Sequence, residues 1–181
     1  MGASRDPEGR RRAIIEAAGQ LLAEVGAGRL THRLVAERAG VPLGATTYYF
    51  SSLEDLVAQT VEYVGERAAQ DLRMLGERLA HGGDVAATLA EVFAEYSRET
   101  RQAVLVAEMY LAAAYRPELR PVARRWFDEM AGLLAGYVPR PVAVAVTTYL
   151  DGMWIRVMLH EEPPDRDALA ASLRALLALE A

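Results

Sequence analysis

Residues 31–50 read Thr31-His-Arg-Leu-Val-Ala-Glu-Arg-Ala-Gly-Val-Pro-Leu-Gly-Ala-Thr-Thr-Tyr-Tyr-Phe50, and the rest of the chain is organised around this stretch. Thr31 is a natural N-cap for a short helix, and Gly40 stands where that helix must end. Pro42 suits the first turn of a second short helix, because its fixed φ is already helical. Gly40 also tolerates a positive φ in the turn, and Ala36 is small where the two helices would touch. The spacing therefore predicts a helix-turn-helix whose second helix reads DNA.

Charge is distributed unevenly along this chain of 181 residues, whose formal net charge is −5. Residues 1–50 hold seven Arg against five acidic residues, whereas residues 51–181 hold thirteen Arg against twenty. The first part therefore carries the positive charge that nucleic acid attracts, and the second part faces other partners.

The chain contains no cysteine, which excludes disulfides, thiolate metal sites and thiol nucleophiles. No signal peptide precedes the first helix, and no uninterrupted apolar stretch is long enough to span a bilayer. We therefore expect a soluble, cytoplasmic protein without membrane contact.

Apolar residues recur at helical spacing through most of the chain, and no stretch gives a convincing strand signal. The expected fold class is all-α with about nine helices. The domains that we expect are a flexible arm (1–9), a helix-turn-helix DNA-binding domain (10–52) and a larger helical domain (53–181).

The larger domain is expected to begin with one long helix over residues 53–80, capped by Ser52 and ended by Gly82-Gly83. Asp84 can cap the next helix, and a break is expected around residues 99–102. The later helices are separated by prolines: Pro117, Pro139, Pro141, Pro163 and Pro164.

The last two helices offer more apolar surface than a small helical domain can cover by itself. An apolar helix pair that its own chain does not wrap is usually wrapped by a second copy. We therefore predict a homodimer, whose interface is drawn from Leu150, Trp154, Val157, Leu173, Leu176 and Leu177.

The helix-turn-helix stretch resembles the TetR family of bacterial transcription regulators. The family hallmark is a Thr-capped helix, Ala-Gly-Val, a Gly-containing recognition helix, an aromatic pair with Phe, and a following Leu. This chain meets it with Thr31, Ala39-Gly40-Val41, Gly44, Tyr48-Tyr49-Phe50 and Leu56. It departs from the family at Leu53, where a phosphate-binding Lys is usual, and at Thr46, where an aliphatic core residue is usual.

The resemblance implies a dimer that presents two recognition helices to a palindromic DNA operator, most often as a repressor. The residues that it places against DNA are Thr31, Arg33, Pro42, Leu43, Gly44, Ala45, Thr47, Tyr48 and Tyr49. Phe50 is expected in the core, with the tyrosine hydroxyls exposed.

The expected recognition helix has an unusual composition. Residues 42–49 include no Arg, Lys, Asn or Gln, the residue types that make strong bidentate contacts to bases. Sequence preference would then lean on DNA shape and on arginines outside this helix, such as Arg10, Arg11 and Arg12.

The middle helices carry methionines and aromatic residues at helical spacing, a pattern that is typical of plain core as well as of a binding pocket. The resemblance implies an internal, mainly apolar effector cavity in this region. The candidates for its lining are Tyr96, Met109, Tyr110, Trp126, Met130, Tyr149 and Met153, with Glu108, Asp151 and Arg156 as polar determinants.

Two rival functions were weighed against a ligand-responsive regulator. An enzyme is disfavoured, because the three histidines lie far apart and no metal-binding or nucleophile motif occurs, so we expect no metal and no cofactor. The second rival is a helical interaction module whose degenerate helix-turn-helix no longer binds DNA. Leu53 and the acidic total charge leave that alternative open.

Overall fold

The structure, a computed structural model, describes residues 6–98 and 100–179, with only the backbone for residues 100–103. These described residues form nine α-helices, two short 3₁₀ helices and no strand, which confirms the predicted all-α class. The chain divides into two compact units between Val64 and Gly65. The sequence-based boundary at residue 52 instead falls where a helix begins.

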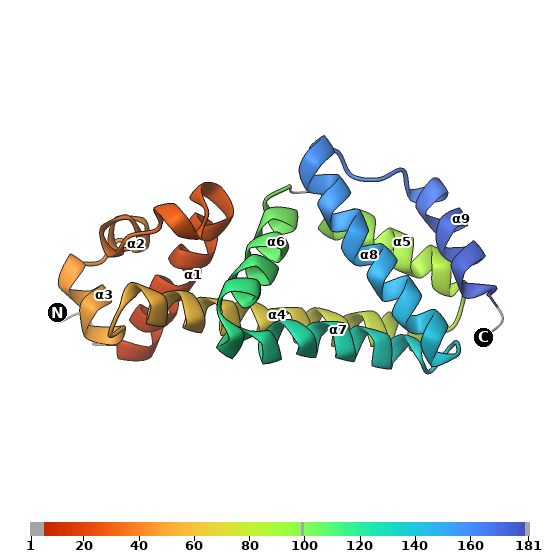
Figure 1. The fold of residues 1–181 in the computed structure, drawn as a ribbon, viewed down its shortest axis with the longest axis horizontal. Coiled ribbons are helices and arrows are strands. Elements are labelled where there is room, and N and C mark those ends of the chain that lie inside the picture. Colours follow the sequence, from red (N-terminus) through yellow and green to blue (C-terminus); the bar gives the residue numbers. More distant parts are fainter. Residues whose placement is uncertain (1–5, 99, 180–181) are drawn as a thin grey trace. The chain divides into compact units, whose positions relative to one another are not determined.

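The N-terminal unit consists of three helices, a 3₁₀ turn and the first part of a fourth helix (Figure 1). These elements are α1 (Pro7–Val25), η1 (Ala27–Arg29), α2 (His32–Ala39), α3 (Leu43–Tyr49) and α4 (Leu53–Ala80).

Helix α1 begins earlier than the sequence pattern suggested. Residues 7–9 were assigned to a flexible arm, but they form the first turn of α1, while residues 1–5 of that arm lie outside the described residues. Asp6 is the N-cap, and its Oδ1 accepts a hydrogen bond of 2.8 Å from the backbone N–H of Gly9. Asp followed by Pro is a strong helix start, because the side chain satisfies a free N–H and Pro needs none.

The predicted helix-turn-helix is present as α2, a turn and α3. Thr31 Oγ1 accepts from the Leu34 N–H at 3.2 Å, as expected of an N-cap. Gly40 ends α2 in the left-handed region, with φ 65°, where a side chain would add strain. Pro42 is the N-cap of α3 rather than part of its first turn, because its ψ of 143° is extended.

Helix α4 has the bounds that its sequence predicted. Ser52 Oγ accepts from the Asp55 N–H at 3.1 Å at its start. At its other end, Gly82 and Gly83 adopt positive φ values of 84° and 126° just after the last turn. The helix is continuous across the division between the two units.

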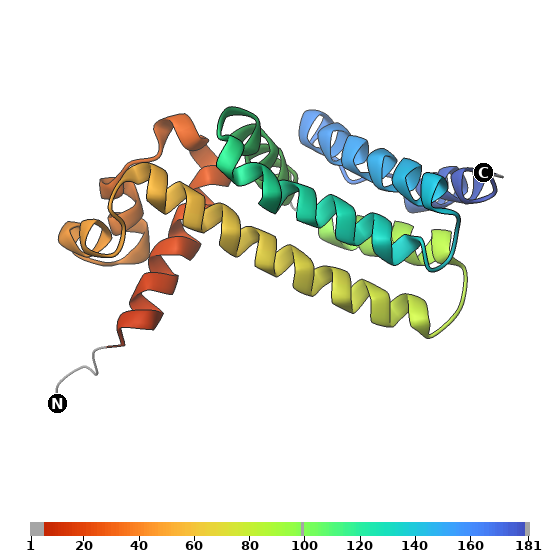
Figure 2. The same ribbon diagram turned by 60° about the horizontal axis from the view of Figure 1, so that its bottom comes forward.

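The C-terminal unit contains the remainder of α4 and five further helices (Figures 1 and 2). These elements are α5 (Val85–Tyr96), α6 (Thr100–Tyr115), η2 (Pro117–Leu119), α7 (Arg120–Leu134), α8 (Arg140–His160) and α9 (Arg166–Leu177). The expected break around residues 99–102 includes Glu99 and side chains that lie outside the described residues.

One apolar core joins α4, α5, α7, α8 and α9 in this unit, and Leu89, Leu134, Val146 and Leu173 are among its buried residues. Asp84 caps α5 as predicted, accepting from the N–H groups of Ala86 and Ala87. Its other carboxylate oxygen accepts from Arg174 of α9 at 2.7 Å, so a single side chain links the start of α5 to the last turn of α9.

Helix α8 corrects one expectation from the sequence. By length and composition alone it could cross a membrane, the one helix among the described residues that could. The same test is passed by core helices of helical bundles, and α8 buries Val142, Val146, Leu150 and Val157 in the core just described. The apolar side chains of α8 therefore contribute to the core of the C-terminal unit.

Helices α4 and α7 lie side by side, and their packing depends on glycine (Figure 2). A Cβ placed on Gly65 would lie 2.8 Å from Cγ1 of Val122, and one on Gly76 would lie 3.3 Å from Cδ1 of Leu133. Gly65 is buried, so the absent side chain lets the two helix backbones come close.

Gly65→Ala should therefore destabilise the protein, whereas Gly132→Ala should stabilise it. Gly132 is the control, because it lies in α7 where an added Cβ meets no atom within 4 Å. In an open helical position, Gly→Ala gains up to about 1 kcal/mol from helix propensity. At Gly65 the contact with Val122 should cancel this gain and lower stability by roughly 1 kcal/mol or more. Urea unfolding followed by circular dichroism measures both variants. Equal stabilisation by the two substitutions would show that the α4–α7 contact is not tight.

Candidate functional site

Helix α3 presents an exposed surface of small and aromatic side chains. Tyr48 is 81% exposed and Leu43 is 46% exposed. Gly44 is exposed as well, and a Cβ added to it would meet no atom within 4 Å. The fold itself therefore does not require glycine at this position. A partner molecule that approaches the α3 backbone closely would require it, because any side chain there would stand in the way.

The opposite face of α3 is anchored in the core of the N-terminal unit. Thr46 is fully buried, and its Oγ1 donates to the carbonyl oxygen of Leu43 at 2.8 Å. This bond supplies the partner that a hydroxyl needs when it replaces an aliphatic side chain. Phe50, which follows α3, is 1% exposed, so α3 is fixed at its centre and at its end.

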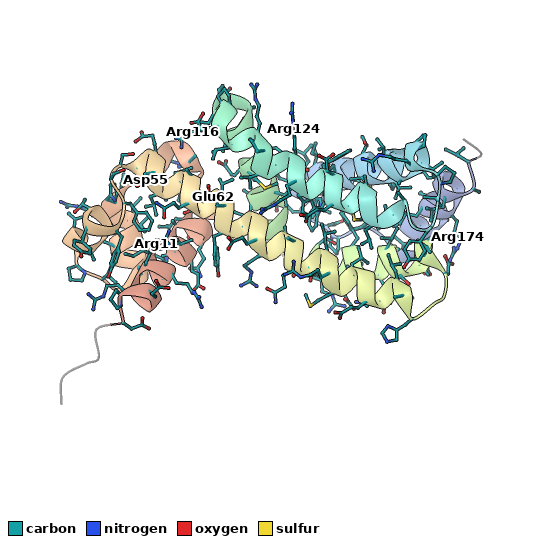
Figure 3. The ribbon with its side chains drawn as sticks, turned by 90° about the horizontal axis from the view of Figure 1, so that it is seen from below. Arg11, Asp55, Glu62, Arg116, Arg124 and Arg174 are labelled. Carbon is teal, nitrogen blue, oxygen red and sulfur yellow. The ribbon has the colours of Figure 1, made fainter. Side chains whose placement is uncertain are left out.

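A chain of polar contacts lies behind the end of α3. The Asp55 carboxylate accepts from the backbone N–H and the hydroxyl of Ser51, at 2.8 and 2.9 Å, and from the Gln59 amide at 2.6 Å. These bonds, that of Gln59 first, hold the pKa of Asp55 below its usual value. Gln59 in turn accepts from Arg11, whose guanidinium lies 5.9 Å from the centre of the Phe50 ring (Arg11 and Asp55 are labelled in Figure 3).

The contacts of Arg11 change the interpretation of the arginine cluster at residues 10–12. Arg10, Arg11 and Arg12 were weighed together as DNA contacts, but Arg11 is engaged by Gln59 and Phe50 within its own unit. It therefore has a structural role in supporting the α3–α4 loop.

The other sequence-predicted contact residues gather around α3 and the start of α2. Thr31, Arg33, Pro42 and Thr47 are exposed, whereas Ala45 and Tyr49 are half-buried. The rings of Tyr48 and Tyr49 meet edge to face, with centroids 5.0 Å apart. Thr31 Oγ1 serves as an acceptor in the α2 cap, which leaves its O–H free to donate to an outside oxygen.

In the C-terminal unit, the most distinctive polar group is Asp151 of α8. Its Oδ2 accepts a hydrogen bond of 3.0 Å from the hydroxyl of Tyr110 on α6. Its Oδ1 is buried and has no hydrogen-bond partner among the described residues. The sequence indicates Asp151 only as one of three polar residues near the expected effector cavity. Its hydrogen bond with Tyr110 could not be predicted, because the two residues are distant in sequence.

Burial dominates the electrostatics of this pair. Desolvation raises the pKa of Asp151 from its usual 3.8 to about 6, although the hydrogen bond from Tyr110 acts in the opposite direction. Burial, and then the neighbouring carboxylate, also raise the pKa of Tyr110. Tyr110 therefore remains a hydrogen-bond donor at every physiological pH.

A second Tyr–Asp pair involves Tyr96 of α5 and Asp71 of α4. Burial raises the pKa of Asp71, and a hydrogen bond with the Tyr96 side chain opposes that shift. The pKa of Tyr96 is raised by burial and by the Asp71 charge. Tyr96 therefore ties α5 to α4.

The remaining effector candidates are divided between core and partly exposed positions. Met130 belongs to the core cluster, and Tyr149 and Met153 pack against it. Met109 is buried and Trp126 is half-buried, both outside this cluster. The structure thus brings together Met130, Tyr149 and Met153, and the Tyr110–Asp151 hydrogen bond links Tyr110 to α8.

The candidates for a dimer interface need correction. Leu150, Val157 and Leu173 are at most 4% exposed and belong to the core of the single chain, so they offer no surface to a second copy. Trp154 stacks on Phe93, with ring centroids 4.6 Å apart. Leu176 and Leu177 are half-buried against the same core.

A different face of α8 is exposed and apolar. Val144 is 37% exposed, Ile155 54% and Leu159 71%. Thr148 and Gly152 lie between them at helical spacing and are also exposed. A Cβ on Gly152 would meet no atom within 4 Å, so a glycine there has no role in the packing of the single chain. A glycine inside an exposed apolar stripe was the sequence signal that could have indicated this face.

Comparison with protein families finds two matches along the chain. Residues 14–60 match "Bacterial regulatory proteins, tetR family". Residues 80–179 match "Tetracyclin repressor-like, C-terminal domain".

Individual relatives agree with these matches. The chain is 26% identical over 165 residues to the HTH-type transcriptional regulator BetI of Cronobacter sakazakii, covering 85% of this chain and 82% of BetI. The structure of a TetR-family member from Streptomyces coelicolor A3 shares 34% identity, with a TM-score of 0.81 over 94% of this chain and 99% of that one. The multidrug binding protein EbrR, crystallised with ethidium, shares 36% identity, with a TM-score of 0.75 over 94% and 99% of the two chains.

Asp151→Asn should stabilise the protein, and the gain should grow with pH. Because the pKa of Asp151 is raised on folding from 3.8 to about 6, its proton is bound more tightly in the folded state. Stability from this group is therefore complete below pH 4 and is lost between about pH 4 and 6. Asn avoids that loss, which should amount to about 2 kcal/mol at pH 8 after allowing for partial solvent exposure.

Urea unfolding of Asp151→Asn and of the parent at pH 4.5 and pH 8, at one protein concentration, measures the difference. Asp128→Asn, which alters an exposed carboxylate of α7, serves as the control and should show no such trend. A stability difference for Asp151→Asn that stays constant across this pH range would contradict the assignment of a raised pKa.

Proposed function

The chain belongs to the TetR family of DNA-binding transcriptional regulators, with a ligand-binding C-terminal domain, and we propose that it acts as a homodimeric repressor of a palindromic operator. A small, mainly apolar effector bound in the C-terminal unit would release it from DNA. Members of this family are regulators rather than enzymes, in agreement with the prediction from sequence.

The exposed face of α3 is the observation that carries the DNA-binding part of this proposal. The helix is anchored from behind by Thr46 and Phe50, while Gly44 and Tyr48 face outward. Gly44 would let a sugar-phosphate backbone or a base edge approach the helix, and the Tyr48 hydroxyl would donate to a phosphate. The rival interaction module gives no reason for an outward-facing glycine in a rigidly held helix.

Positive charge near the proposed DNA contacts comes from α2 rather than from α3. Arg33 is exposed next to Thr31, whose hydroxyl can donate to an outside oxygen. The first N–H groups of α2 point in the same direction as this cap and favour an anion. Arg38 of α2 is less available than Arg33 for a DNA phosphate, because its guanidinium forms a salt bridge of 2.6 Å with Glu24.

A second copy of the chain is the partner that suits the exposed stripe of α8. Val144, Ile155 and Leu159 form an apolar stripe, and Gly152 within it would allow two α8 helices to cross closely. Helix α9 packs beside α8 and exposes small residues, Ala168, Ala171 and Ala175, which extend the face. Two copies joined through these faces would form a four-helix bundle.

A ligand site in the C-terminal unit is supported by similarity to EbrR, whose crystal structures include complexes with ethidium, proflavin and malachite green. The methionines and aromatic residues of α6 and α8 provide adaptable apolar contacts for such a molecule. Helix α4 would transmit binding, since it contributes to both units without a break. A coupling of about 1–3 kcal/mol would change DNA affinity roughly 5- to 150-fold.

Tyr48→Ala should weaken DNA binding, whereas Tyr115→Ala should not. Both tyrosines are 81% exposed, so the two substitutions remove equal surface, but Tyr115 ends α6 in the C-terminal unit. Loss of one phosphate contact of about 1 kcal/mol in each half-site should reduce affinity roughly tenfold or more. Fluorescence anisotropy on duplexes selected from a random pool measures the effect.

Failure to select any duplex would favour the interaction module. Equal affinity of Tyr48→Ala and the parent for a selected duplex would remove Tyr48 from the DNA contacts, while leaving DNA binding intact.

Gly152→Leu should convert the dimer into a monomer of 19.8 kDa. A leucine at this position is accommodated in the single chain, because a Cβ there meets no neighbour, but it would separate the two α8 helices. Gly132→Leu is the matched control, since Gly132 is also helical, exposed and free of neighbours. Sedimentation velocity at micromolar concentration gives the mass, and circular dichroism confirms folding.

A parent protein that sediments as a monomer would contradict the homodimer. A dimeric Gly152→Leu variant would show that another face forms the interface.

A further inference from the structure

We propose that Asp151 and Tyr110 form the recognition site for a positively charged effector, an apolar organic monocation whose charge meets the Oδ1 atom of Asp151. This inference rests on the proposed function, because it names the class of effector that the C-terminal unit takes. It follows from the contacts of the carboxylate itself.

The two oxygens of Asp151 have different surroundings. Oδ2 accepts from the Tyr110 hydroxyl at 3.0 Å, which fixes the orientation of the carboxylate between α6 and α8. Oδ1 is buried without any hydrogen-bond partner among the described residues. A buried acceptor without a donor loses its hydration and gains nothing in return, so such groups are rare and mark either strain or an absent partner.

No charged group of the described chain compensates Asp151. Burial and the Tyr110 hydroxyl are the only causes that act on its pKa, so no basic side chain contributes. Arg156 lies on the same helix but is exposed. A cationic partner for Oδ1 is therefore not supplied by these residues.

A proton satisfies Oδ1 only over part of the pH range. Because the pKa of Asp151 is about 6, the side chain is mostly ionised at neutral pH and mostly protonated only below pH 6. At neutral pH the Asp151 carboxylate is therefore mostly negatively charged, and its Oδ1 atom accepts no hydrogen bond from the described residues. The pair has no stabilising purpose within the chain, since an uncharged side chain of the same shape would avoid the cost.

The neighbours of Asp151 indicate an apolar cation rather than a metal ion or an ammonium ion alone. Trp154 lies one helical turn further along α8, on the same side of the helix as Asp151, and is half-buried against the core. Aromatic faces such as that of Trp154 attract organic cations. No group of three metal-ligating side chains occurs among the described residues.

The test compares two ligands that share one ring system, N-methylphenanthridinium, which is a permanent cation, and neutral phenanthridine. Calorimetric titration of DNA-free protein should show tighter binding of the cation by roughly tenfold or more, as for other charge-assisted contacts. Asp151→Asn keeps the acceptor for Tyr110 but removes the charge, so it should abolish this preference and leave phenanthridine binding within about twofold.

Asp128→Asn removes an equal formal charge from the exposed face of α7 and should bind both ligands like the parent. Asp151→Asn is expected to be at least as stable as the parent, so misfolding would not imitate the result.

Other outcomes separate this inference from the proposed function. Equal binding of both ligands by the parent would overturn the cation site while supporting an effector site. A cation preference that survives Asp151→Asn would place the charge recognition elsewhere and overturn the assignment to Asp151. Binding of neither ligand would overturn the cation site and the aromatic effector together, whereas DNA binding measured on selected duplexes would be unaffected.

Discussion

One uninterrupted helix, α4, supplies buried residues to both compact units, and the remaining elements depend on that continuity. Leu56, Val57 and Val61 are buried in the N-terminal unit. Leu75 and Leu79 belong to the core of the C-terminal unit. Neither core can therefore be completed unless α4 is formed, and fraying at either end would expose apolar surface. The capping bond at Ser52 and the Arg78 contacts with Glu91 and Glu95, at 3.0 and 2.9 Å, act at its two ends.

The helices could be located from the sequence to the extent that their ends depend on local chemistry. Thr31, Ser52 and Asp84 each satisfy a free N–H within a few residues of themselves, so their role can be read from the neighbouring sequence. Asp6 and Pro7 are an equally local signal, but residues 1–9 show no helical periodicity and were therefore predicted to form a flexible arm. The start of α1 was therefore placed three residues too late.

The faces of α8 could not be assigned in the same way. This helix is apolar almost all round at its start, so periodicity does not distinguish the side that packs on its own core from the side left exposed. The sequence predicts Leu150 and Val157 as interface residues, but both are buried in the core, whereas Ile155 and Leu159 are exposed. The positions of α6, α7 and α9, which depend on contacts distant in sequence, decide between the faces.

The same limit applies to the candidate sites. Exposure of Tyr48 and burial of Phe50 follow from a short helix with one buried face and could be predicted. The engagement of Arg11 by Gln59 and that of Tyr110 by Asp151 could not, because each joins helices whose mutual placement no local pattern encodes. The first contact changes the expected role of Arg11 from DNA contact to support, and the second distinguishes Asp151 from the other two polar residues expected near the effector cavity.

The composition of α3 has a consequence for how a regulated DNA site would evolve. If α3 contacts DNA as proposed, a helix with methyl groups, hydroxyls and a glycine on its exposed face, but without Arg, Lys, Asn or Gln, would distribute its selectivity over many weak contacts. A single base-pair change would then cost little, whereas a mismatched base pair typically costs about 1–3 kcal/mol. Binding sites could accumulate mutations gradually without loss of control, and several related sites in one genome could be bound with similar strength.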